Sequence, residues 1–73
     1  MKKTFMGRSA QKLALNIQKI RRLKGMTQGD LCRILNVDRS YMSNVENGKK
    51  NPTLSTIEKI ARALNVSIDE LLK

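Results

Sequence analysis

Apolar residues recur along the chain with the period of α-helices. Leu13, Ile17 and Ile20 follow the i, i+4, i+7 spacing of a helix that buries one face. Similar spacing returns further along the chain, whereas no stretch alternates between apolar and polar residues as a half-buried strand does. The pattern predicts an all-α domain over residues 9–73, with five helices at 9–24, 28–35, 39–47, 54–64 and 68–72.

The four later helices share one kind of start. A residue suited to cap a helix precedes each of them, at Thr27, Asp38, Thr53 and Ser67. Asp30 and Glu70 stand where a capping box needs an acidic side chain. A hydrophobic staple can span each cap, in the pairs Met26 with Leu31, Val37 with Met42, Pro52 with Ile57, and Val66 with Leu71. This agreement supports the helix boundaries, and the first and third helices should end at Gly25 and Gly48.

Two short helices separated by the turn Asn36-Val37-Asp38 occupy residues 27–48. This arrangement is typical of a helix-turn-helix, in which the second helix reads bases in the major groove of DNA. Met42 and Val45 fall on the inner side of that helix, and short polar residues gather opposite them, at Ser40, Ser43, Asn44 and Asn47. Because such residues are poor helix formers, a requirement other than helix stability favours them here.

Two charged residues fall on the buried edges of the predicted helices. Arg21 follows Ile20 and lies four positions after Ile17, and Glu46 lies at the inner edge of the third helix. Glu46 also stands near a helix C-terminus, where the macrodipole disfavours a negative charge. Since a buried charge needs a partner, the sequence predicts a structural ion pair between Arg21 and Glu46.

Positive charge is concentrated in the first part of the chain. Residues 1–50 hold twelve Lys or Arg against three Asp or Glu, and residues 51–73 hold three of each, so the net charge of +9 comes from the first fifty residues. Clustered positive charge favours a polyanionic partner, and a merely solvated basic surface is the simpler alternative. Residues 1–8 are interpreted as a flexible basic tail, which either aids solubility or lies along DNA as an arm.

The composition excludes several classes of protein. With no histidine and a single cysteine, Cys32, the chain lacks a set of metal ligands and a nucleophile paired with a base. No metal, cofactor or enzyme activity is therefore expected, and Cys32 should lie in the core. No segment has the apolar length of a signal peptide or a membrane span, which predicts a cytoplasmic protein without a membrane partner.

A series of short motifs extends over most of the chain. They are Thr27-Gln28-x-x-Leu31, Asn36-Val37, Tyr41-Met42-Ser43-x-Val45-Glu46-Asn47-Gly48, Pro52-Thr53-Leu54 and Ile60-Ala61-x-Ala63-Leu64-x-Val66. Together they resemble the lambda repressor and Cro type of helix-turn-helix proteins, also called the xenobiotic-response-element family. The resemblance implies a compact five-helix lambda-repressor-like domain. Cys32 in place of the usual alanine and Asn36 in place of the usual glycine are mild departures, because cysteine is small and asparagine tolerates a left-handed conformation.

The resemblance also implies roles for individual residues. Gln28 matches a glutamine that contacts phosphate and braces the recognition helix, at a helix N-terminus that suits an anion. The principal base-reading positions are matched by Arg39, Ser40 and Asn44, with Ser43 close by. Contacts to the DNA backbone are implied for Tyr41, Asn47 and Lys49, and we expect the same of the neighbouring Lys50. Arg21 and Glu46 match the buried ion pair of the family.

The sequence thus predicts a transcriptional regulator that binds double-stranded DNA in a sequence-specific manner. One small reading helix covers few base pairs, so we expect a homodimer on an inverted-repeat operator, acting as a repressor or as a controller of the phage or restriction-modification type. The candidate dimer surface consists of Leu54, Leu71 and Leu72. The alternative is a protein-interaction module with the same fold, such as an antitoxin with a toxin partner.

Overall fold

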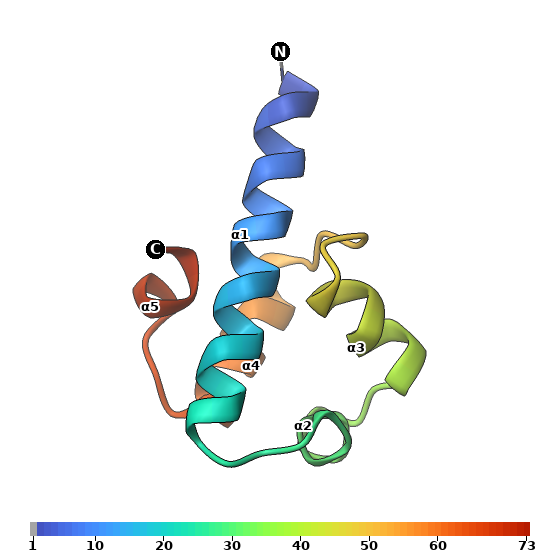
Figure 1. Cartoon of the computed structure of the whole chain (residues 1–73), viewed down its shortest axis with the longest axis vertical. Helices are drawn as coiled ribbons and strands as arrows, with labels where there is room; N and C mark the ends of the chain where they lie inside the picture. Colours follow the sequence, from blue (N-terminus) through green and yellow to red (C-terminus); the bar gives the residue numbers. More distant parts are fainter. Residues whose placement is uncertain (1) are drawn as a thin grey trace.

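The predicted helices are all present in the computed structural model, which describes the backbone of residues 2–73 and the side chains of residues 10–73. In chain order they are α1 (Lys2–Leu23), α2 (Gln28–Leu35), α3 (Arg39–Glu46), α4 (Leu54–Leu64) and α5 (Ile68–Leu72) (Figure 1). No strand occurs in residues 2–73, and the predicted all-α fold of five helices is confirmed.

The first helix is longer than the sequence predicts. It begins at Lys2 instead of following Ser9, and its first turns project beyond the other helices (Figure 1). No proline interrupts residues 2–9, and a formed helix extends without a second nucleation cost, so α1 can continue backwards past Ser9. The mobility of the basic segment 1–8 stays a prediction, and Met1 lies outside the described residues.

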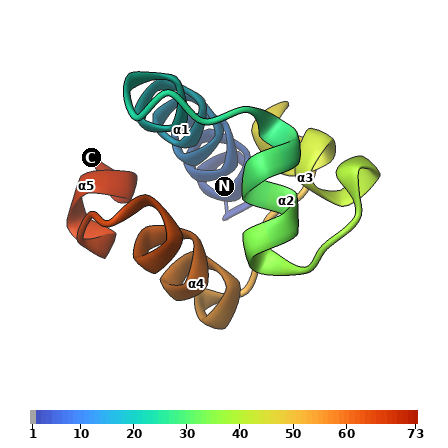
Figure 2. The same ribbon diagram turned by 90° about the horizontal axis from the view of Figure 1, so that it is seen from below.

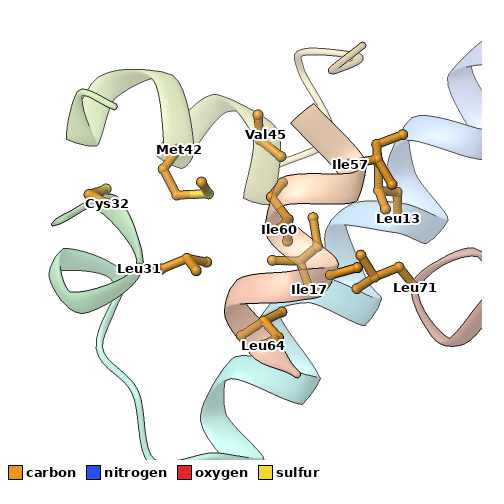
Figure 3. Packing of buried hydrophobic residues seen from close by; sticks show 11 residues of the cluster. Leu13, Ile17, Leu31, Cys32, Met42, Val45, Ile57, Ile60, Leu64 and Leu71 are labelled. Atoms are coloured by element: carbon orange, nitrogen blue, oxygen red, sulfur yellow. The ribbon is translucent and has the colours of Figure 1, made fainter. Parts of the chain in front are cut away.

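One small core holds the five helices together. α1 packs against α3 and α5, α2 packs against α3 and α4, and α4 packs against α5. Seen from below, α2 and α3 lie to one side of α1, while α4 and α5 lie beneath it (Figure 2). Apolar side chains from all five helices fill the space between them, namely Leu13, Ile17, Leu31, Cys32, Met42, Val45, Ile57, Ile60, Ala61, Leu64 and Leu71 (Figure 3). The angle between α2 and α3 therefore depends on α1 and α4 as well as on the turn.

One of the three candidate dimer residues is not available at the surface. Leu71 is fully buried in the core of its own chain, and its carbonyl oxygen accepts a hydrogen bond from Asn16 Nδ2 on α1 at 2.7 Å. A helix as short as α5 is stable only through packing of this kind, which explains why Leu71 points inward. Leu54 and Leu72 remain exposed, at 62% and 49% of their surface.

Three of the four predicted caps are made by side chains. Thr27 and Asp30 form a complete capping box, with Thr27 Oγ1 accepting from the Asp30 backbone N–H at 3.0 Å and Asp30 Oδ2 accepting from the Thr27 N–H at 2.9 Å. The Thr27 N–H is also the main reason that the pKa of Asp30 lies below its ordinary value of 3.8. The stabilisation that this carboxylate contributes is thus present above about pH 3.8 and is lost as the pH falls through the lowered pKa. Thr53 and Ser67 cap α4 and α5 through their hydroxyl oxygens alone, which accept from the backbone N–H groups of Thr56 and Glu70.

Two details of the predicted helix starts are wrong. Asp38 has the extended backbone of a capping residue, but its side chain makes no capping hydrogen bond. The Met42 N–H donates to the Asp38 carbonyl oxygen at 3.1 Å, which is the ordinary first hydrogen bond of the helix. At α5, the Glu70 carboxylate does not complete a capping box, and its Oε2 atom lies 3.8 Å from Lys73 Nζ.

Left-handed backbone conformations mark the ends of four helices. Gly25 and Gly48 have φ of 71° and 75°, and Asn36 and Asn65 have φ of 58° and 59°. Gly48 is constrained by space as well, because a Cβ atom there would lie 3.1 Å from Cγ and 3.3 Å from Cα of Gln11 on α1. The end of α3 therefore approaches α1 as closely as it does only with glycine at position 48.

The two glycines allow the effect of backbone strain to be separated from the effect of crowding. Gly25→Ala should lower the free energy of unfolding by about 1–2 kcal/mol, the usual cost of a left-handed alanine, because nothing lies within 4 Å of its Cβ. Gly48→Ala should cost more, since it adds the clash with Gln11. Urea unfolding followed by circular dichroism measures both, and equal losses would contradict the close packing of residue 48 against α1.

Candidate nucleic-acid interface

The two faces of α3 differ in chemistry. Met42 and Val45 are buried in the core. The opposite face carries Ser40, Ser43 and Asn44, and Arg39 flanks it in the first turn. Of these four residues expected to read bases, Ser43 is half-buried and the others are exposed. α3 has eight residues and is therefore about 12 Å long, which suits the width of the DNA major groove. The structure thus brings the predicted base-reading residues together on one accessible helix face.

Three of the residues expected to contact phosphate, Asn47, Lys49 and Lys50, lie directly after α3. Asn47 is the C-cap residue of α3 and is exposed. The backbone N–H groups of Lys49 and Lys50 donate to the Asn44 carbonyl oxygen at 2.9 and 3.3 Å, so the loop folds back onto the helix. Lys50 Nζ lies 5.4 Å from the ring centroid of the half-buried Tyr41, within range of a cation–π interaction. The two lysines are therefore held beside the reading helix.

Gln28 links the start of α2 to the end of α3. It is the first residue of α2 and is half-buried. Its Nε2 atom donates to Glu46 Oε1 at 3.2 Å. This bond is of the kind that the bracing role implied for Gln28 by the resemblance would require.

The expected ion pair between Arg21 and Glu46 is formed and is buried. Arg21 Nε donates to Glu46 Oε2 at 2.8 Å and Arg21 Nη2 donates to Glu46 Oε1 at 3.0 Å, a two-pronged geometry that is the strongest available to these groups. The third nitrogen, Nη1, donates to the carbonyl oxygen of Met26 at 2.9 Å, immediately before α2. Only 8% of Arg21 and 4% of Glu46 is exposed. One guanidinium therefore joins α1 to α3 and to the entrance of α2.

Sequence reasoning missed two members of this cluster. Gln18 Nε2 donates to the Glu46 carbonyl oxygen, and Gln28 reaches the Glu46 carboxylate. Gln18 lies three residues before Arg21 and so on a neighbouring part of α1, a signal that could have placed it near α3. In residues 10–73, no buried side-chain nitrogen or oxygen lacks a hydrogen-bond partner, so the cluster is fully satisfied.

Cys32 is buried, as the sequence predicts, and its thiol is not activated for reaction. Its side chain belongs to the core, and its Sγ atom lies 3.9 Å from the Asp38 carbonyl oxygen. Burial raises the pKa of the thiol, which therefore stays protonated at neutral pH. Cysteine here fills the space that alanine usually occupies in the motif.

The part of the chain that the structure describes contains neither a metal-ligand cluster nor a membrane-spanning helix. Among the described residues, no three His, Cys, Asp or Glu side chains gather in the manner of metal ligands. No described helix combines the length and the apolar character that crossing a membrane requires.

The pattern and the fold both match a known protein family. The family model HTH_3, described as helix-turn-helix, matches residues 17–71, which include α2, α3 and α4 in full. The chain belongs to the Cro/C1-type helix-turn-helix family. The resemblance inferred from the motifs is thereby confirmed.

Several relatives of this Cro/C1-type protein have been named or solved. Control protein C.SmaI of Serratia marcescens is 38% identical over 60 residues, which cover 82% of this chain and 71% of that protein. The hypothetical transcription factor NHTF from Neisseria has a similar structure, with a TM-score of 0.84 and 42% identity over 89% of this chain and 75% of that chain. The restriction-modification controller protein C.Esp1396I, solved as a tetramer in complex with its natural 35 base-pair operator, has a TM-score of 0.74 and 40% identity over 88% of this chain and 95% of that chain.

These matches establish the class of this Cro/C1-type protein. It is a helix-turn-helix transcriptional regulator, and restriction-modification controllers are among its relatives. The family and the three proteins described above are regulators and not enzymes. Their names give no support to a toxin partner.

The buried ion pair generates a stability prediction. Glu46→Leu should lower the free energy of unfolding by about 3–5 kcal/mol, because the Arg21 guanidinium is then buried without its counter-charge. Adding Arg21→Met to that variant should recover part of the loss, since no unpaired charge is left. Urea unfolding measures both variants. A double variant as unstable as the sum of its two single changes would show that the partners do not depend on each other.

Proposed function

We propose that the chain binds double-stranded DNA as a homodimer on an inverted-repeat operator and thereby regulates transcription. The observation that carries this proposal is the polar, accessible face of α3 opposite its buried Met42 and Val45. The buried ion pair of Glu46 with Arg21 holds the C-terminal end of that helix, so the position of the helix is already fixed in the absence of DNA. The operator complex of the relative C.Esp1396I supports the same class of ligand here.

Two residues of α3 have the chemistry to specify bases. Arg39, at the first position of α3, can donate two hydrogen bonds to O6 and N7 of guanine. Asn44 can pair with N6 and N7 of adenine. Each such pair contributes about 1–3 kcal/mol of discrimination against a wrong base. Ser40 and Ser43 lie on the same face and can add shorter contacts to either kind of base.

Phosphate contacts would set the register of the reading helix. The proposed contacts come from Gln28, Tyr41, Asn47, Lys49 and Lys50. The first turn of α2 would present the positive end of its helix dipole to a phosphate, which favours an anion. The concentration of positive charge in residues 1–50 supports the same orientation toward a polyanion.

The chain is too small to recognise a long site alone, which is why we propose a dimer. A single reading helix covers one half-site, and two copies would place two helices about one turn of DNA apart. Leu54 at the start of α4 and Leu72 at the end of α5 are large apolar residues that the monomer leaves exposed. They are the remaining candidates for the surface between the two copies.

Selection of bound duplexes from a random library tests the division of roles. Arg39→Ala should relax the preference at one base pair of each half-site, because only that contact to guanine is lost. Gln28→Ala should weaken binding to all sequences alike, because phosphate contacts carry no sequence information. A preferred site that is unchanged for Arg39→Ala would remove this residue from the readout.

The dimer surface can be tested with two leucines that are both exposed. Leu72→Asp should shift the chain toward monomers in analytical ultracentrifugation and weaken operator binding, since a charge would be placed in an apolar contact. Leu23→Asp on α1 is the control, because Leu23 is also exposed, at 78%, but lies outside the proposed surface. Equal behaviour of the two variants would contradict the proposed interface.

A further inference from the structure

The Glu46 carboxylate is the meeting point of a cluster that extends to the proposed DNA surface. Its two oxygens accept hydrogen bonds from Arg21, and Oε1 also accepts from Gln28 Nε2 at 3.2 Å. Glu46 itself is 4% exposed and cannot reach a phosphate. Gln28, in contrast, is half-buried and stands at the first position of α2.

We propose that Glu46 is a positioning residue for DNA binding: its carboxylate holds one N–H of the Gln28 amide so that the other N–H is directed to a DNA phosphate. The proposal rests on the function proposed above, in which Gln28 contacts phosphate. It assigns an effect on DNA affinity to a residue that does not touch DNA.

The donors and acceptors of Glu46, Gln28 and a phosphate restrict how these groups can bond. An ionised carboxylate can only accept hydrogen bonds, and so can a phosphate diester. The Gln28 amide offers two N–H donors on one nitrogen and a single carbonyl oxygen on the other side. Since Glu46 accepts from that nitrogen, the amide cannot turn its oxygen inward without placing two acceptors against each other. The nitrogen therefore stays on the side of Glu46, with its second N–H free for an anion.

Arg21 makes this arrangement rigid. Its Nε and Nη2 atoms bind different oxygens of Glu46 and thereby prevent rotation of the carboxylate. Its Nη1 atom binds the Met26 carbonyl oxygen just before α2, which fixes the backbone from which Gln28 extends. The Gln18 amide holds the main-chain carbonyl of Glu46 as well. The acceptor and the start of α2 are thus held by the same side chain of α1.

A neutral amide at position 46 would lose this directional control. Glutamine has nearly the same shape as glutamate, but it can donate as well as accept. In Glu46→Gln, the Gln28 amide can therefore take either orientation, and one of them presents its oxygen instead of its nitrogen to the phosphate. The variant keeps the size of the buried side chain, but it also removes the counter-charge of Arg21 and sets the new amide nitrogen against an Arg21 donor, so a loss of stability accompanies the change in hydrogen-bond direction. The Gln28→Ala background separates the two effects, because only the change in hydrogen-bond direction passes through Gln28.

A double-mutant cycle on DNA affinity tests the coupling. The probe is a duplex that carries the site selected by the wild-type chain, titrated at constant salt. Glu46→Gln should weaken binding about tenfold in the wild-type background and less than about twofold in Gln28→Ala, because its effect passes through Gln28. In Lys49→Ala, whose proposed phosphate contact is independent of Glu46, the full weakening of about tenfold should persist.

The outcomes separate this proposal from others. If Glu46→Gln weakened DNA binding equally in all three backgrounds, Glu46 would act only through the fold, and the proposal would be overturned. The absence of any weakening of DNA binding in the wild-type background would also overturn it. Failure of the wild-type chain itself to bind any duplex would overturn the proposed function and with it the phosphate role of Gln28. The wild-type titration distinguishes that case from the others.

A second measurement does not depend on a variant that folds. In nitrogen-15 spectra of the free wild-type chain, the Gln28 side-chain amide should exchange more slowly with solvent than the amide of the exposed Gln11, because one of its protons is bound to Glu46. Equal exchange of the two amides would show that the bond does not persist in solution and would overturn the proposal.

Discussion

The buried pair of Arg21 with Glu46 is the interaction on which the arrangement of the helix-turn-helix depends. Two short helices of eight residues have little stability alone, and their angle is useful only if it is fixed against the rest of the domain. Arg21 fixes it from α1, by bonding to the end of α3 and to the chain just before α2. A buried pair is not a large net source of stability, because removing two charges from water is costly. Its effect here is geometric, because one side chain of α1 bonds at the same time to the end of α3 and to the chain before α2.

Packing and polar bonding cooperate in this placement. The core joins all five helices, and Leu31 and Met42 bring the inner faces of α2 and α3 into it. Dispersion contacts of this kind hold the helices together without choosing a single angle between them as strictly as hydrogen bonds do. The ion pair and the close approach of Gly48 to Gln11 supply that choice at the end of α3. The exposed face of α3 is therefore not needed to hold the helix in place.

The sequence predicts those parts of the structure that local chemistry decides. The capping box of Thr27 and the left-handed Gly25 and Gly48 follow from contacts within a few residues. The pairing of Arg21 with Glu46 is also predictable, because two opposite charges on buried helix edges leave few other solutions. The sequence pairs Leu71 with Val66 in a staple but does not predict that Leu71 is buried away from a dimer surface, since that depends on how α5 lies against α1. The bond from Gln28 to Glu46 could likewise not be predicted, because an amide can bond to many partners and only the packed structure determines which one.

The central claim is that the accessible face of α3 and the first turn of α2 form the DNA surface. Amide chemical-shift mapping with an operator duplex tests it most directly, since every helix reports separately. The account predicts that the largest changes fall in residues 28–30 and 39–50, with small changes along the exposed side of α1. Changes centred on α1 or on α4, with α3 unaffected, would contradict the account.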